Sequence, residues 1–129
     1  MSRITKIVLL TMAAFLVLGF SVTAYADKPD KPQVMRSAAI PGYWHNCNAT
    51  NIADREIFVT WKLLSESGFE QDDKTEWIPA GETYSLVRIT GTFSRCVISW
   101  VGQPGEIRGS FCSYYANNPA NIGACLDLF

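Results

Sequence analysis

The chain has 129 residues, of which 11 are Lys or Arg and 12 are Asp or Glu, so its formal net charge is −1. The basic residues form no cluster of the kind that binding to a phosphate backbone needs, and we therefore expect no nucleic-acid partner. The chain has a single histidine and four cysteines, which limits the catalytic and metal-binding sites that it could form.

Residues 1–26 have the three parts of a secretory signal peptide. Arg3 and Lys6 form a basic start, residues 7–20 are an apolar run, and Ala24-Tyr25-Ala26 has the small-x-small form of a cleavage site. The apolar run is shorter than the roughly 20 residues that cross a bilayer. We expect a secreted, extracellular or periplasmic protein with no stable membrane anchor after cleavage. Its mature part keeps 9 basic and 12 acidic residues, a net charge of −3.

The next stretch, DKPDKPQ, combines charged residues with two Lys-Pro steps. Proline lacks an amide donor and biases the residue before it toward extended conformations. We therefore predict a flexible leader over residues 27–40, followed by a single β domain over residues 41–129.

Apolar and polar side chains alternate over residues 57–64. The alternation puts four apolar side chains on one face: Ile57, Val59, Trp61 and Leu63. This pattern favours a strand. A helix is the alternative, because Ile57, Trp61 and Leu64 are spaced four and three apart. Asn51 or Asp54 could cap such a helix, and Gly68 could end it.

The rest of the domain alternates between apolar stretches and polar turns. Strands are expected at 83–91, 93–102 and 107–116. Loops or turns are expected at 65–74, 79–82, 103–106 and 117–123, and the chain ends on 124–129. Short strands separated by Gly/Pro turns predict an all-β fold, a small antiparallel β-sandwich that is immunoglobulin-like or barrel-like.

The cysteines lie in the exported part of the chain: Cys47, Cys96, Cys112 and Cys125. An even number in an oxidising compartment predicts two disulfides. If a hairpin turns at 103–106, Cys96 and Cys112 point to different faces, whereas Cys112 and Cys125 could meet across the last hairpin. This favours Cys47–Cys96 with Cys112–Cys125. The pairing Cys47–Cys112 with Cys96–Cys125 stays open.

The order Cys47, Trp61, Cys112 resembles the Cys…Trp…Cys spacing of immunoglobulin domains. That resemblance implies a sandwich architecture, and it would favour the second disulfide pairing.

Three short motifs are similar to those of small exported bacterial domains of unknown function. They are Cys47-Asn48-Ala49-Thr50, Trp77 with Ala80-Gly81, and Phe111-Cys112. The resemblance implies an exported β domain and no known chemistry. The first motif is also an N-glycosylation sequon, but we favour a local turn in which the Asn48 side chain bonds nearby amides.

The sequence assembles no recognisable catalytic or metal motif. In a strand, His45 shares a face with Cys47, and a disulfide would remove that cysteine as a nucleophile. Glu70, Asp72 and Asp73 lack the spacing and the glycine of a calcium loop, so a solvated loop is the better interpretation. We expect no catalytic residue, no metal and no cofactor.

Aromatic side chains are the remaining candidates for ligand contact: Trp44, Trp77, Phe111 and Tyr115. Exposed rings offer a large contact area at low entropic cost, although burial in the core competes for each of them. We expect a secreted or periplasmic, non-catalytic domain, monomeric or weakly oligomeric, that binds a protein or a glycan. The alternative is a small secreted hydrolase that uses carboxylates or His45.

Overall fold

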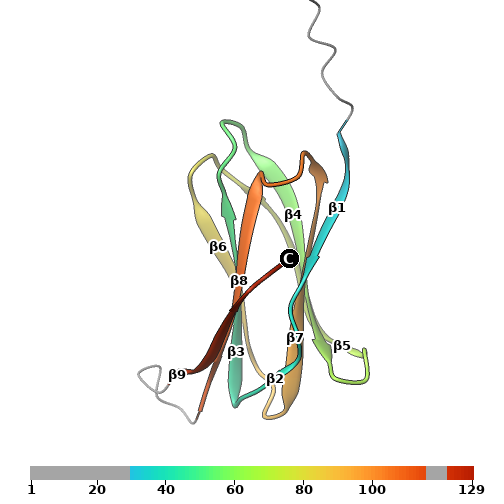
Figure 1. The fold of residues 1–129 in the computed structure, drawn as a ribbon, viewed down its shortest axis with the longest axis vertical. Helices are drawn as coiled ribbons and strands as arrows, with labels where there is room; N and C mark the ends of the chain where they lie inside the picture. The colour runs from blue at the N-terminus through green and yellow to red at the C-terminus, as the bar shows by residue number, and fades with distance from the viewer. Residues whose placement is uncertain (1–29, 116–121) are drawn as a thin grey trace, which may run out of the picture.

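The computed structural model describes residues 30–115 and 122–129, so the predicted signal peptide (1–26) and most of the 117–123 loop lie outside the described residues. The described chain is an antiparallel β-sandwich with two disulfides, as predicted (Figure 1). The strands are β1 (Lys31–Arg36), β2 (Ile40–Pro41), β3 (Trp44–Asn51), β4 (Ile57–Ser65), β5 (Glu70–Ile78), β6 (Thr83–Ile89), β7 (Phe93–Gly102), β8 (Ile107–Tyr114) and β9 (Ile122–Asp127).

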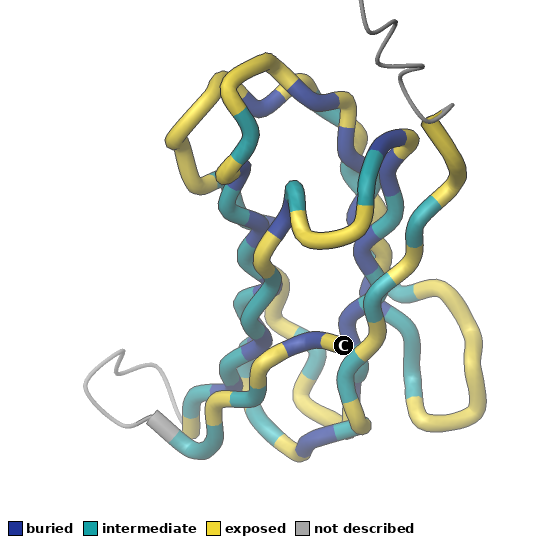
Figure 2. Tube along the Cα trace, turned by 45° about the horizontal axis from the view of Figure 1, so that its top comes forward, coloured by how far each residue is buried: buried dark blue, intermediate teal, exposed yellow. Residues whose placement is uncertain are grey.

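Two sheets face each other across one core. Sheet A has the order β1-β7-β4-β5, with β2 also pairing β7, and sheet B has the order β6-β3-β8-β9. Buried and partly exposed residues alternate along the central strands, and the loops at both ends are largely exposed (Figure 2). Within the described residues, no helix is long and apolar enough to cross a membrane.

The predicted strand at 57–64 is confirmed as β4, and the helical alternative is wrong. Ile57, Val59, Trp61 and Leu63 all face the core with 0–1% exposure. Burial of alternate residues is what a strand with one covered face requires. Neighbouring strands β5 and β7 pair with β4 on both sides, which makes it a central strand of sheet A.

The favoured disulfide pairing is confirmed, but one step that led to it was wrong. β7 and β8 do not form a hairpin, because residues 103–106 carry the chain from sheet A to sheet B. Cys47 on β3 and Cys96 on β7 are both fully buried and bridge the two sheets. Cys112 and Cys125 lie directly opposite each other on β8 and β9, within sheet B.

The prediction of a flexible leader is wrong for part of residues 27–40. Residues 31–36 form β1, which pairs with β7 at the edge of sheet A, and Ile40 is buried in the core. Pro32 is compatible with this position because a strand edge leaves half of the amides unpaired. Residues 27–29 of the predicted leader lie outside the described residues.

The loop predicted at 65–74 is shorter than expected, because β5 begins at Glu70. The tight turn that precedes it contains Gly68, with φ of 90°. Charged residues occupy both faces of β5, so the apolar alternation that marks a strand is missing. Such inward-pointing charges are a known protection of sheet edges against pairing with other chains.

The inward charges of β5 are paired at the open side of the sandwich, between β5 and β6. Lys74 lies over the rings of Trp61 and Tyr84, at 5.7 and 5.6 Å from the ring centroids, and its Nζ lies 2.6 Å from Glu76. Asp72 lies 3.8 Å from Arg88 on β6. These contacts satisfy charges that would otherwise be costly at a partly buried position.

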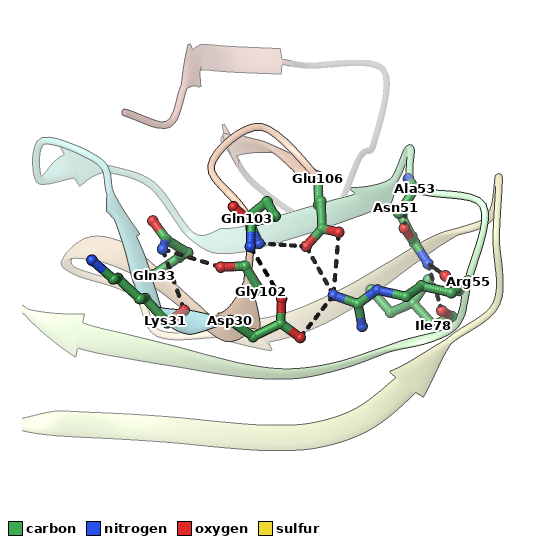
Figure 3. Close-up of polar contacts among 10 residues, drawn as sticks. All are labelled: Asp30, Lys31, Gln33, Asn51, Ala53, Arg55, Ile78, Gly102, Gln103 and Glu106. Atoms are coloured by element: carbon green, nitrogen blue, oxygen red, sulfur yellow. Dashed lines mark hydrogen bonds and ion pairs between the residues drawn. The ribbon is translucent and has the colours of Figure 1, made fainter. Parts of the chain in front are cut away.

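A polar network closes the end of the sandwich where β1 begins (Figure 3). The Arg55 guanidinium donates to both carboxylate oxygens of Glu106 at 3.2 and 3.1 Å and lies 3.5 Å from Asp30. The amide of Gln103 donates to Glu106 at 2.7 Å. A side chain at Gly102 would collide with Glu106, which explains the glycine. The start of β1 is thus attached to the two loops that follow β3 and β7.

Candidate functional site

The outer face of sheet B carries an aromatic and aliphatic cluster at one end. Trp44, the first residue of β3, lies opposite Ile89 on β6 and Tyr114 on β8. The rings of Trp44 and Tyr114 are 5.7 Å apart and tilted by 43°. Val87 belongs to the next row, two residues along β6. We call these four residues the Trp44 face.

Side chains of the Trp44 face are accessible. Val87 and Ile89 are 48% and 60% exposed, and the two rings are half-buried. A shallow groove of about 560 Å³ is lined by Trp44, Val87, Arg88 and Ile89. Its size lies within the range of small-molecule sites, about 300–1,000 Å³, but its openness to solvent suits one surface patch of a larger ligand.

The middle of the same outer face is polar and held together by side-chain hydrogen bonds. Asn48 accepts from the Ser85 hydroxyl at 2.6 Å and donates to the Ser110 hydroxyl at 3.2 Å. The hydroxyls of Thr50 and Thr83 lie 2.7 Å apart. These bonds join β6, β3 and β8, so they fix the strands that present the Trp44 face.

Asn48 therefore does not occupy the turn that the sequence suggested. It lies in the middle of β3, with both functional groups of its amide engaged in hydrogen bonds to neighbouring strands. Its neighbour Asn46 lies between Val87 and Cys112 on the same outer face, and its Oδ1 is shielded and has no hydrogen-bond partner among the described residues. A shielded acceptor without a partner is uncommon in folded proteins, and this one lies in the same row as Val87 of the Trp44 face.

The aromatic residues predicted to contact a ligand do not come together. Trp77 is 54% exposed on the outer face of sheet A, where it packs against Phe58 at 4.9 Å. Tyr115 is 51% exposed at the end of β8, next to Gly123. The prediction is wrong for Phe111, which is fully buried against His45.

Sequence reasoning missed three members of the Trp44 face: Val87, Ile89 and Tyr114. Their signal was present in the alternation of β6, where outward positions change from Thr83 and Ser85 to the aliphatic pair. Tyr114 could be assigned to the outer face only once its pairing with Trp44 was known.

His45 occupies a closed polar pocket in the core. Its Nε2 lies 3.0 Å from the Ile40 carbonyl, to which it donates, and its Nδ1 lies 2.8 Å from the Thr90 hydroxyl, from which it accepts. The ring stacks on Phe111 with a centroid distance of 5.3 Å. Burial lowers the pKa of His45 below its usual value, and the bond to Ile40 opposes that shift only in part.

The contact between His45 and Thr90 has the geometry of a base beside a hydroxyl nucleophile. However, His45 is fully buried, and the amides of Thr90 and Gly91 both donate to the Tyr43 carbonyl at 3.0 and 2.9 Å. Those two amides cannot also stabilise an oxyanion. The arrangement therefore fits a structural histidine that attaches β2 and the turn after β6 to β3.

The acidic residues of β5 do not converge either. Glu70 forms an ion pair with Lys62, and Asp72 faces Arg88. Over residues 30–115 and 122–129, no group of three or more His, Cys, Asp or Glu side chains is placed to hold a metal ion.

No protein-family profile, no curated protein and no solved structure matches this chain. A function for the protein therefore has to be inferred from the geometry of the Trp44 face.

Proposed function

We propose that the protein is an exported binding domain that contacts a protein ligand through the Trp44 face. The observation that carries this proposal is an exposed aromatic and aliphatic cluster on a sheet whose outer face carries few charges. Single exposed apolar residues are ordinary on a protein surface, but a contiguous group around a groove is typical of an interaction site. Export rests on the signal peptide predicted at residues 1–26, and the two disulfides are compatible with an oxidising compartment.

A protein ligand is favoured over a glycan by the composition of the cluster. Val87 and Ile89 are aliphatic and offer a sugar no hydrogen bonds, whereas an apolar centre with a polar surround is common in protein interfaces. The polar surround consists of Asn46 and the hydrogen-bonded Asn48 row, which follow Trp44 along β3 on the same outer face. The strands are already held in register by hydrogen bonds, so binding would order few side chains.

The test compares two tryptophans on opposite faces. The mature chain is screened against protein and glycan arrays, and any captured ligand is titrated against Trp44→Ala and Trp77→Ala. Loss of a central aromatic anchor typically costs about 2 kcal/mol, so Trp44→Ala should weaken binding about 30-fold. Trp77→Ala should leave it within twofold, as a rough limit for a residue outside the interface.

Equal binding by wild type and Trp44→Ala would contradict the proposal, provided that both proteins keep their disulfides and their circular dichroism spectrum. A ligand found only among glycans would retain the Trp44 face but reject a protein partner. The alternative of a hydrolase that uses His45 predicts turnover of ester, peptide or glycan substrates that is abolished in His45→Ala.

A further inference from the structure

The outer face of sheet A, opposite the Trp44 face, carries a groove lined by basic residues. Strand register places Arg36 on β1, Val97 on β7 and Lys62 on β4 in one row across the sheet. Arg95 lies two residues from Val97, paired with Leu64. Residues two apart on a strand share a face, so all three basic side chains project from the same side. They line a groove of about 250 Å³ together with Ser37, Leu64 and Val97.

The charges in this groove are only partly balanced. Lys62 forms an ion pair with Glu70 and also lies opposite Asp73, and these two carboxylates raise the pKa of Lys62. Over the described residues, neither Arg36 nor Arg95 has a carboxylate within ion-pair distance. The groove therefore keeps an excess of about one positive charge in a mature chain whose net charge is −3.

Arg95 gives a second, independent indication that the groove can bind an anion. Its Nε is shielded from solvent and has no hydrogen-bond partner among the described residues. A guanidinium donor that loses water without gaining an acceptor is costly, and an anion bound at the terminal nitrogens of Arg95 would offset that cost. The flanking hairpin turn lies close to the guanidinium, since a Cβ at Gly68 would stand 3.4 Å from a terminal nitrogen of Arg95.

We propose that Arg36, Arg95 and Lys62 form a binding site for one phosphate or sulfate ester group. The arginine forks match the oxygens of such a group in geometry, and its negative charge complements the positive excess in the groove. Because 250 Å³ is below the size of a typical drug-sized site, the groove accepts the charged group and its nearest atoms, not a whole large ligand. The group could belong to a soluble ester or to a phospholipid headgroup.

The test follows the arginine side-chain Nε–H signals of the ¹⁵N-labelled mature chain by NMR. Glycerol phosphate and inorganic sulfate are titrated at constant ionic strength, with chloride as the balancing anion. The Arg95 signal should shift in a saturable way. Arg95→Gln should weaken the affinity about tenfold, the equivalent of one charge-assisted hydrogen bond. Arg36→Gln, on an exposed edge strand, gives a second variant with the same expectation.

Arg108→Gln is the matched control, since Arg108 is an exposed arginine on the outer face of sheet B. It should bind both probes as the wild type does. Co-sedimentation with phosphatidylglycerol vesicles, compared with phosphatidylcholine alone, identifies the source of the group. Binding to vesicles that is lost in Arg95→Gln indicates a lipid headgroup, and binding to glycerol phosphate alone indicates a soluble ester. No saturable shift with either probe, or equal loss in Arg108→Gln, would overturn the proposal.

Discussion

The two sides of sheet B differ although they are built from alternate residues of the same strands. On the inner side, His45 stacks on Phe111, and Cys47 is bonded to Cys96 of the other sheet. On the outer side, Trp44 contacts Tyr114, and the Cys112–Cys125 bond stays within the sheet. Each side thus has one aromatic contact and one disulfide.

The difference lies in what these similar groups can do. On the inner side, the aromatic pair and the disulfide are both fully buried, so they stabilise the packing of one sheet on the other. Outside, the Trp44–Tyr114 pair remains half-exposed, and Cys125 is exposed. The residue type alone therefore does not decide whether a side chain of these strands is structural or available for contact. Its place in the alternation between the inner and outer faces decides it.

The largest expected effect comes from removing the inner disulfide. In Cys47→Ala/Cys96→Ala, the lost link spans 49 residues, and the chain-entropy relation gives a loss of about 4 kcal/mol in the free energy of unfolding. Urea denaturation measures this loss. If the double variant were as stable as the wild type, the core would hold the two sheets together without the bridge.

Removal of the outer disulfide should cost less. Cys112→Ala/Cys125→Ala opens a link of 13 residues, for which the same relation gives about 3 kcal/mol. Because Cys125 is exposed and Cys47 and Cys96 are not, a thiol reductant should also open the outer bond first in the folded wild type. Mass spectrometry after brief reduction and alkylation identifies the order. Simultaneous release of all four thiols would contradict the distinction between the two sides.

The smallest expected effect is a dependence of stability on pH that comes from His45 on the inner side of sheet B. Burial lowers the pKa of His45 in the folded state, so the unfolded chain binds a proton more readily. The contribution of neutral His45 to the free energy of unfolding is therefore fully present above about pH 6.5. It is lost as the pH falls through the lower folded-state pKa, by at most about 1.4 kcal/mol per pH unit. Urea midpoints at several pH values measure it.

His45→Gln is the control for that measurement, because glutamine does not titrate. Its stability should be lower at neutral pH, where the bond to Ile40 or to Thr90 is weakened, and flatter below pH 6.5. A slope equal to that of the wild type would assign the pH dependence to carboxylates instead.

Sequence alone was sufficient for the features that depend on local alternation. The burial of Val59, Trp61 and Leu63 followed from period 2, and the turn expected at 79–82 contains Gly81 with φ of 80°. The Cys112–Cys125 bond was favoured by the symmetry of a single hairpin, although the other pairing stayed open until the structure was known. In each case the deciding contacts are close in sequence.

Features that depend on pairing between distant strands were not predictable in the same way. Phe111 and Tyr115 fall on the same face of the strand expected at 107–116, yet Phe111 is buried, whereas Tyr115 follows the end of β8 and is exposed. The Trp44 face joins the start of β3 to the ends of β6 and β8, which are 45 and 70 residues further along the chain. The charged strand β5 lacks apolar alternation because paired ions, not apolar side chains, fill its inner side.

The polar network of Arg55, Glu106 and Asp30 (Figure 3) lies at the opposite end of the sandwich from Trp44, because Trp44 begins β3 and Arg55 follows its end. Seven steps along an extended strand separate the two ends by roughly 20 Å or more. A tether or fusion partner placed ahead of Asp30 would thus hold the domain with the Trp44 face directed away from the attachment point. Immobilisation through the amino-terminal side is therefore the best orientation for capture experiments.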